Sequence, residues 1–292
     1  MREEFRSLID LTVRLKVRCT SLDRPDEDEL AEYRGTGMLR VGTGCIWLCS
    51  GPEYNKPCVC FKCAGKVAEK HWTFHVRTAQ HVVYNSEEAR KTKVDLFYDD
   101  SSCQRDGKMW SVMVVDKLSS PSEIDWCDML CATCDEDLGG RIESAWSCWL
   151  HEGVQNPQDL SGLNLVPFCD EGPDPVVIVS HPHGQPKKIT VGEVKYRAKR
   201  GPRIMEYNTP TCPGSSGATV FAYDRNRGKF SYISAISAVH SGSYDKPCTE
   251  HKHRFNLLKR IFNKLRGHEA TVVQLNYGYC GVLVLNCPRK RI

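Results

Sequence analysis

The sequence has enough apolar content for two domains, and the spacing of its apolar residues indicates both strands and helices. Its 292 residues are 40% hydrophobic, which suffices to bury one large core or two moderate ones. Apolar side chains alternate between residues 13 and 17, which is the period of a half-buried strand. Helical spacing of apolar residues occurs near the two ends, at residues 5–9 and 255–265.

A candidate nucleophile follows Thr211, where Ser216 and Gly217 precede an apolar strand. A serine hydroxyl is a poor nucleophile until a neighbouring base takes its proton, so the motif needs a histidine from elsewhere in the chain. The segment Thr78-Ala-Gln-His81 predicts a strand that ends in a short turn and presents an imidazole. Taken alone, each motif is also typical of an ordinary turn or of a structural histidine.

Five motifs in a particular order extend this pattern along the chain. They are Gly35-Thr-Gly-Met-Leu, Thr78-Ala-Gln-His81, Val176-Val-Ile-Val-Ser-His-Pro-His-Gly184, Cys212-Pro-Gly214-Ser-Ser216-Gly217 and Ile236-Ser-Ala-Val-His240-Ser-Gly242. Together they resemble the trypsin-like (chymotrypsin-fold) serine peptidases over residues 35–284, a family whose triad members follow the order His, Asp, Ser. The resemblance implies an all-β fold of two six-stranded antiparallel barrels with the active site in the cleft between them.

The same resemblance divides the chain into three parts. Residues 1–34 are expected to form an N-terminal extension with a short helix, a strand and an acidic loop. Residues 35–150 are expected to form the first β-barrel with the His and the Asp, and the acidic run at residues 135–137 is expected to be a solvated loop. Residues 151–292 are expected to form the second β-barrel, with the Ser, the substrate pocket and a C-terminal amphipathic helix.

The resemblance assigns catalytic roles residue by residue. Ser216 is expected to attack the peptide carbonyl, His81 to carry its proton, and Asp125 to hold the imidazole in the required tautomer. Asp128 is the alternative acid, but it is expected to lie on the outward face of a half-exposed strand. The backbone N–H groups of Gly214 and Ser216 are expected to form the oxyanion hole.

Thr211 and His240 are candidate specificity residues. Their placement resembles the pocket of picornavirus-type main proteases and bacterial glutamyl endopeptidases, which use a threonine and a histidine to bind a Glu or Gln side chain. An imidazole and a hydroxyl can both donate to a carboxylate or amide oxygen in a buried pocket. The alternative is that His240 is a packed core histidine.

These motifs predict a serine endopeptidase that cleaves protein substrates after Glu or Gln. The residue before the nucleophile is Ser215, where secreted trypsins carry the aspartate of their activation switch, so we expect a site assembled on folding or completed by an activating partner. A weaker resemblance to peptidase modules of invertebrate immune-type proteins suggests a role in immune or stress signalling. Three alternatives stay open: a catalytically silent trypsin-like module that binds peptides, a zinc-stabilised interaction protein that acts through the loop from Cys58 to Cys63 or the basic helix near Phe255, and a viral-type protease that processes a polyprotein.

Sixteen cysteines are present, and one group of them has the spacing of metal ligands. The segment Cys58-Val-Cys60-Phe-Lys-Cys63 offers three ligands for a structural zinc, which takes four N or S ligands. A thiol-rich loop without metal is the alternative, and catalysis itself requires no cofactor. The candidates for the fourth ligand are Cys49, Cys103 and His71.

Charge and hydropathy limit the expected partners. No run of about 18 apolar residues exists, so no membrane span is expected. Basic residues interrupt the apolar positions of the N-terminal segment and leave no signal peptide, so we expect a cytoplasmic protein with free thiols such as Cys45, Cys169 and Cys280. A net charge of +4 is too small to argue for nucleic acid, so the expected partner is a protein or peptide substrate.

Overall fold

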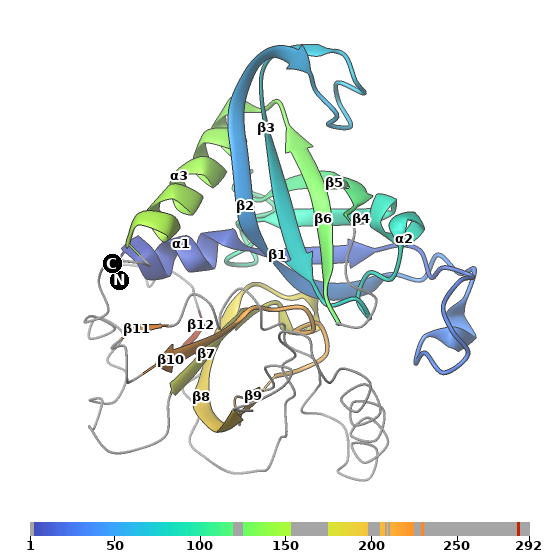
Figure 1. Ribbon diagram of the computed structural model, residues 1–292, viewed down its shortest axis with the longest axis vertical. Coiled ribbons are helices and arrows are strands. Elements are labelled where there is room, and N and C mark those ends of the chain that lie inside the picture. The colour runs from blue at the N-terminus through green and yellow to red at the C-terminus, as the bar shows by residue number, and fades with distance from the viewer. Residues whose placement is uncertain are drawn as a thin grey trace.

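The computed structural model describes most of the first half of the chain and shorter segments beyond it. The described residues are 3–118, 125–152, 175–197, 205–207, 209, 211–224, 229–230 and 285–286. Within them the chain is mostly β, with one closed barrel, one further antiparallel sheet and few helices (Figure 1).

Six strands close into an antiparallel barrel in the order β1-β2-β3-β6-β5-β4 (Figure 1). The barrel closes because β1 pairs with β4 on one side and with β2 on the other. A closed barrel leaves no strand edge exposed. The strands are β1 (Thr12–Val17), β2 (Arg40–Pro57), β3 (Val67–Thr78), β4 (Thr92–Leu96), β5 (Trp110–Lys117) and β6 (Cys127–Thr133).

Strand β1 confirms the alternating pattern read at residues 13–17. Val13, Leu15 and Val17 are buried in the barrel core, as the two-residue period of a strand requires. On the other face, Arg14 pairs with Asp95 of β4 at 2.7 Å. The barrel thus starts before residue 35, the start expected from the sequence, because closure needs the strand that follows the N-terminal helix.

The segment Gly35-Thr-Gly-Met-Leu precedes β2 and forms no strand, in contrast to the family pattern that it resembles. Gly35 has a φ of +72°, a conformation that strands do not use and that glycine adopts without steric cost. Its N–H donates to Thr20 O at 2.7 Å, and the Thr20 N–H donates to Thr36 O at 3.0 Å, so these bonds join the two ends of the loop between β1 and β2.

A second antiparallel sheet has the order β11-β10-β7-β8-β12, with β9 paired to β8. The apolar run from Val176 forms a strand that leads to the 3-10 helix η3 (Pro182–Gly184), and an apolar strand follows Gly217, as predicted. The strands are β7 (Pro175–Ser180), β8 (Lys188–Arg197), β9 (Met205–Tyr207), β10 (Val220–Asp224), β11 (Lys229–Phe230) and β12 (Leu285–Asn286).

Two helices pack together beside the barrel, and a short third helix lies elsewhere on it (Figure 1). Helix α1 confirms the helical spacing at residues 5–9, and it packs against α3 (Figure 1). Helix α2 lies against β5. The helices of the described ranges are α1 (Glu3–Leu11), α2 (Ser86–Arg90) and α3 (Glu136–Glu152), with the 3-10 helix η1 (Ala31–Tyr33).

The acidic run at residues 135–137 starts α3, so the prediction of a solvated loop was wrong. Asp135 Oδ1 accepts the N–H of Leu138 at 3.0 Å, which is the hydrogen bond of a helix N-cap. Glu136 and Asp137 lie in the first turn, where the helix dipole favours negative charge. Acidic residues are common both in solvated loops and at helix starts. The composition of this run therefore could not distinguish the two structures.

Two adjacent glycines of α3 test how closely the helix packs on the barrel. A Cβ at Gly139 would overlap the Trp72 ring, whereas a Cβ at Gly140 would have nothing within 4 Å. We predict that Gly139→Ala lowers the free energy of unfolding by about 1–3 kcal/mol through overpacking. Gly140→Ala is expected to raise it by about 0.5–1 kcal/mol, because it removes a helix-interior glycine without a clash. Urea denaturation measures both, and equal effects would contradict the packing of Trp72 on α3.

The cysteines of the barrel core, which are Cys45, Cys49, Cys127 and Cys131, are free thiols. Cys45 and Cys127 lie in the barrel core, where burial raises the pKa of Cys45 to about 11 and that of Cys127 to about 12. Such thiols stay protonated near neutral pH and behave as small apolar side chains. The free thiol expected at Cys45 is thus confirmed, while Cys169 and Cys280 lie outside the described residues.

Several expectations fall on residues that the structure does not describe. They include the amphipathic helix at residues 255–265 and the segment Ile236 to Gly242 with His240. Among the described helices, none is long and apolar enough to cross a membrane.

Candidate active site

His81 lies in the turn that follows β3, as residues 78–81 predict. The strand ends at Thr78, whose Oγ1 donates to Thr43 O at 2.7 Å and so ties the strand end to β2. The N–H of Val82 donates to Ala79 O at 3.0 Å and closes the turn. The His81 side chain keeps 32% of its surface exposed, so it stands at the end of the barrel rather than in its core.

Asp125 contacts both the backbone and the ring of His81. Its Oδ1 accepts the His81 N–H at 3.0 Å, and its Oδ2 lies 2.8 Å from His81 Nδ1. Because a carboxylate only accepts hydrogen bonds, the neutral ring carries its proton on Nδ1 and keeps a lone pair on Nε2. Nε2 is buried and has no hydrogen-bond partner among the described residues. In this tautomer the imidazole can take a proton from a nucleophile.

Asp128, the alternative acid, has a different partner. Its two oxygens accept from Arg77 Nε and Nη2 at 2.7 Å each, between β6 and β3. The guanidinium also lies over the Trp47 and Trp126 rings, 4.4 and 4.3 Å from their centroids. Asp128 lies on the face of β6 away from the core, as expected, but the ion pair leaves it only 8% exposed. Asp125 is therefore the acid that the structure brings to His81.

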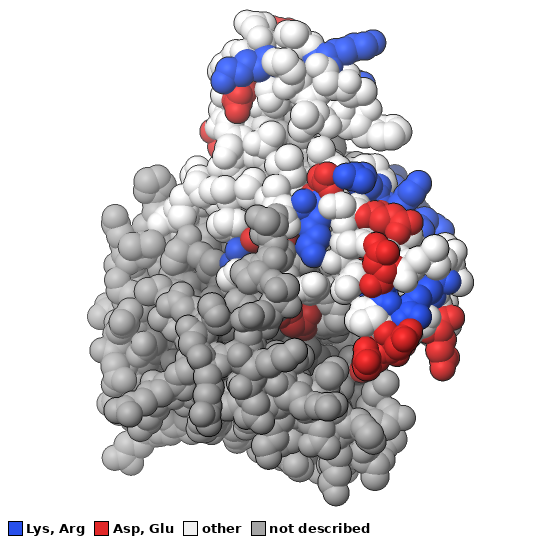
Figure 2. Space-filling view, turned by 45° about the vertical axis from the view of Figure 1, so that its right-hand side comes forward, with Lys and Arg blue, Asp and Glu red and all other residues white. Residues whose placement is uncertain are grey.

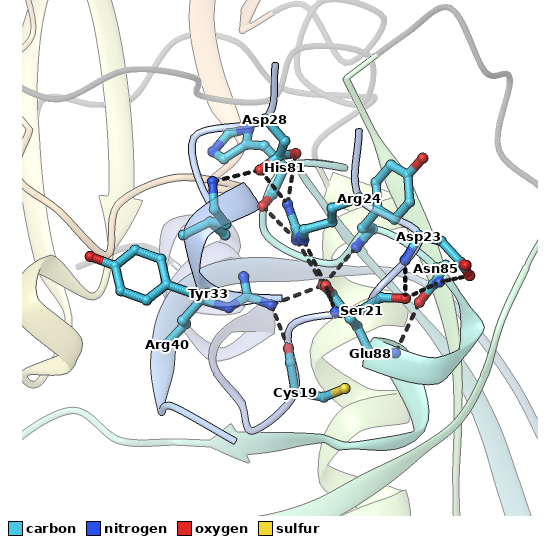
Figure 3. A network of polar contacts seen from close by, with 12 residues as sticks. Cys19, Ser21, Asp23, Arg24, Asp28, Tyr33, Arg40, His81, Asn85 and Glu88 are labelled. Atoms are coloured by element: carbon cyan, nitrogen blue, oxygen red, sulfur yellow. Dashed lines mark hydrogen bonds and ion pairs between the residues drawn. The ribbon is translucent and has the colours of Figure 1, made fainter. Parts of the chain in front are cut away.

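A buried network behind His81 holds its turn (Figure 3). The Arg24 side chain is buried, and its Nη2 donates to His81 O at 3.1 Å. Glu88 accepts from Arg24 Nε and Nη2 at 2.6 and 2.7 Å, and Asp28 accepts from Arg24 Nη1 at 2.9 Å. Arg40 joins the network through Glu88 at 2.9 Å. Charged side chains from the loop after β1 and from α2 thus fix the backbone that carries the imidazole.

Glu88 is the common acceptor of this network. Burial by itself raises the pKa of a carboxyl, but the hydrogen bonds from Arg24 and from the N–H groups of Ser21 and Tyr84 outweigh it. Together with the charge of Arg40, they hold the pKa of Glu88 below its usual value. The carboxylate therefore stays ionised in the interior, where it balances the buried guanidinium.

Sequence reasoning missed Arg24 and Glu88. The spacing Asn85-x-x-Glu88 is a helix-start signal that could have located α2, and Asn85 Oδ1 indeed accepts the Glu88 N–H at 3.2 Å. No local pattern links Glu88 to Arg24, which lies 64 positions earlier in the chain.

The Ser216 turn packs on the part of the barrel that leads to His81. The Thr43 N–H of β2 donates to Ser216 O at 2.9 Å, and Thr43 Oγ1 donates to Gly214 O at 2.7 Å. Gly217 has a φ of +89°, and a Cβ there would overlap Thr43 O. Glycine is therefore required beside the serine, and the close approach places Ser216 and His81 at the same end of the barrel.

The turn also presents backbone donors. Gly214 has a φ of +95°, and a Cβ there would lie 2.7 Å from His181 O, so this position too requires glycine. The His183 N–H donates to Pro213 O at 2.6 Å, so η3 holds the turn in place. Among the described residues, no backbone acceptor lies within hydrogen-bond reach of the Gly214 and Ser216 N–H groups.

Two neighbours of the Ser216 turn are buried. Ser215 Oγ lies 3.1 Å from Ser180 Oγ. Thr211 is buried at the start of the Ser216 turn. His240 lies outside the described residues, so its pairing with Thr211 stays a prediction.

The three cysteines of the loop between β2 and β3 lie together, with their Sγ atoms within 4.8 Å of one another. The three expected candidates for a fourth ligand lie elsewhere. A different residue, Cys134, stands beside the group, with its Sγ 3.8 Å from Cys60 Sγ. The earlier candidates are Cys49 in the barrel core, His71 on β3 opposite Glu53, and Cys103 in the turn before β5.

Charges of both signs are mixed on the surface. Figure 2 shows Lys and Arg side chains standing among Asp and Glu side chains on one face of the described residues. Exposed ion pairs of the described surface include Arg34 with Asp26 and Arg90 with Asp116, each at 2.8 Å.

No protein-family model matches the sequence, and no curated protein does. Among solved structures, the chain is similar to one described as the crystal structure of Deg5, with 13% sequence identity and a TM-score of 0.38. The likeness covers 78% of this chain and 80% of that chain. At this TM-score it supports no inference about the site.

Proposed function

We propose that the chain is a serine endopeptidase that uses Ser216, His81 and Asp125. The observation that carries the proposal is the double contact of Asp125 with the His81 N–H and Nδ1, at 3.0 and 2.8 Å. It fixes the ring and leaves Nε2 buried without a partner among the described residues. A ring held at Nδ1 by a carboxylate, with Nε2 left as an acceptor, is the arrangement of a general base.

In the proposed reaction, His81 Nε2 takes the proton of Ser216 Oγ as this oxygen attacks the peptide carbonyl. Asp125 stabilises the imidazolium that forms. The N–H groups of Gly214 and Ser216 donate to the oxyanion of the tetrahedral intermediate. His81 then gives its proton to the leaving amine, and water repeats the cycle to release the acyl group from the serine.

We propose that the second sheet belongs to a second antiparallel barrel, as in the trypsin-like peptidases. Two features support this architecture. The described strand pairs of the sheet are antiparallel, and Thr43 of the closed barrel bonds to both His181 and Gly214 of the second unit. The active site would then lie where the two barrels meet.

For specificity, we propose cleavage after Glu or Gln, with Thr211 and His240 donating to the substrate side chain. The buried position of Thr211 at the nucleophile turn supports its part in this pocket. The proposed setting in immune or stress signalling follows from the family resemblance alone.

Peptide libraries test the proposed function. The purified full chain is expected to cleave peptides that carry Glu or Gln on the acyl side, and Ser216→Ala or His81→Ala is expected to lower kcat by about 10⁶-fold. Cleavage after other residues would overturn the specificity. A folded wild type that cleaves no library, or hydrolysis that survives Ser216→Ala, would overturn the peptidase itself.

A further inference from the structure

The loop between β2 and β3 is closed by its own backbone. The Cys58 N–H donates to Lys66 O at 2.9 Å, and the Gly65 N–H donates to Cys58 O at 2.8 Å. Within the loop that these bonds close, the Ala64 N–H donates to Cys60 O at 2.8 Å. The tight turn brings the Sγ atoms of Cys58, Cys60 and Cys63 within 4.8 Å of one another.

One sulfur of the group already accepts a hydrogen bond from the backbone. The Cys63 N–H points at Cys60 Sγ, 3.4 Å away. A neutral thiol is a weak acceptor, whereas backbone donors aimed at sulfur are typical of the outer shell of metal-bound thiolates. The turn is thus arranged for a negatively charged sulfur.

Cys134 brings a fourth sulfur from the end of β6. Its Sγ lies 3.8 Å from Cys60 Sγ, and it also contacts Cys63. Four sulfurs placed tetrahedrally about 2.3 Å from a zinc ion are about 3.8 Å apart. A disulfide would need a separation of about 2.05 Å. The 3.8 Å between these two sulfurs fits both a thiol–thiol hydrogen bond and two ligands of one metal ion.

We propose that Cys58, Cys60, Cys63 and Cys134 bind one Zn²⁺ in a closed tetrahedral site. The donor set fits this ion, since four thiolates are a common ligand set of structural zinc. All four ligands come from protein, so the site has no open position and its role is structural. The proposal is independent of the peptidase chemistry.

The zinc would fasten the tip of the β2–β3 hairpin to the start of α3. In Figure 1 this hairpin reaches beyond the remaining strands of the barrel. Its tip has little apolar core, because the cluster beneath it consists of small residues, and Phe61 is 85% exposed. So small a core buries too little apolar area to order the tip, and a bound metal supplies the missing free energy. The apolar cluster comprises Cys58, Cys60, Ala68 and Ala132, with Cys63, Val115 and Cys134 packed against it.

The first test measures the metal in the full chain, purified under reducing conditions without chelators. Elemental analysis is expected to find one zinc per chain, and X-ray absorption at the zinc edge four sulfurs at about 2.3 Å with no nitrogen. A folded chain that binds no zinc on reconstitution would overturn the proposal. So would a nitrogen ligand, or disulfides between these cysteines in the purified protein.

The second test uses matched variants in chelator competition. Cys134→Ser is expected to weaken zinc binding by more than about 100-fold, beyond the loss typical of outer-shell changes. Cys103→Ser, which alters a fourth-ligand candidate that lies away from the group, is expected to leave the affinity unchanged. The reverse pattern would overturn the assignment of Cys134. The absorption spectrum of wild type decides the matter without variants, should Cys134→Ser fail to fold.

Discussion

Asp125→Asn is expected to lower kcat for peptide hydrolysis by about 10⁴-fold while the chain stays folded. The reason lies in the two contacts of Asp125. The His81 N–H needs an acceptor, so the amide oxygen of Asn takes the place of Oδ1 and its NH₂ group faces Nδ1. Nδ1 must then accept, which moves the ring proton to Nε2. In that tautomer His81 cannot take the proton of Ser216.

Asp128→Asn is the matched control, because it makes the same change three positions away in the chain. It breaks the ion pair with Arg77 and is expected to reduce the midpoint of urea denaturation, while kcat stays within about tenfold of wild type. The side chains of this pair are 10% and 12% exposed, so the loss of stability is expected to exceed the 0–1 kcal/mol of a surface pair. Steady-state kinetics and denaturation on both variants separate the roles. A larger loss of kcat in Asp128→Asn than in Asp125→Asn would contradict the assignment of the acid.

Glu88→Gln is expected to lower the free energy of unfolding by about 3–5 kcal/mol, the usual cost of breaking a buried ion pair. Both oxygens of Glu88 face N–H donors: Oε1 those of Ser21 and Arg24, and Oε2 those of Arg24, Arg40 and Tyr84. In either orientation of the Gln amide, its NH₂ group faces other N–H donors. The variant also has no negative charge to balance that of Arg24. Urea denaturation measures the loss.

The same residue has a defined effect on acid stability. Because the pKa of Glu88 is lower in the folded protein than its usual value of 4.5, its contribution is fully present above that value. It is lost as the pH falls through the lower folded value. We expect wild type to lose stability through this acidic range more steeply than Glu88→Gln does, since the variant has no carboxyl to protonate at this position.

Glu87→Gln provides the control on the same helix. Glu87 is exposed, so the variant is expected to stay within about 0.5 kcal/mol of wild type. A similar loss in both variants would show that the charge of α2 matters rather than the buried network.

The parts of the site that sequence could predict depend on local signals. The turn at His81 follows directly from its own strand, and the glycine requirement at Gly214 and Gly217 is visible in the composition of their turn. The short helix and strand at the N-terminus followed from the spacing of their apolar residues. Each of these features depends on neighbours within a few positions.

The parts that sequence could not predict depend on register and on distant contacts. The sequence favoured Asp125 over Asp128, but the partner that holds Asp128 could not be predicted, because the pairing of β3 with β6 sets Arg77 opposite Asp128. Cys134 lies 74 positions after Cys60, and the Cys131-x-x-Cys134 spacing does not reveal this pairing, because Cys131 lies in the barrel core. The membership of β1 in the barrel likewise depends on its pairing with β4, not on its local pattern.

The central claim is that the Asp125–His81 pair activates Ser216, and labelling with a fluorophosphonate probe tests it most directly. Purified wild type is expected to take up one probe per chain, which peptide mass spectrometry maps to Ser216, while Ser216→Ala and His81→Ala stay unlabelled. A folded wild type that does not react, or a label on another residue, would contradict the claim.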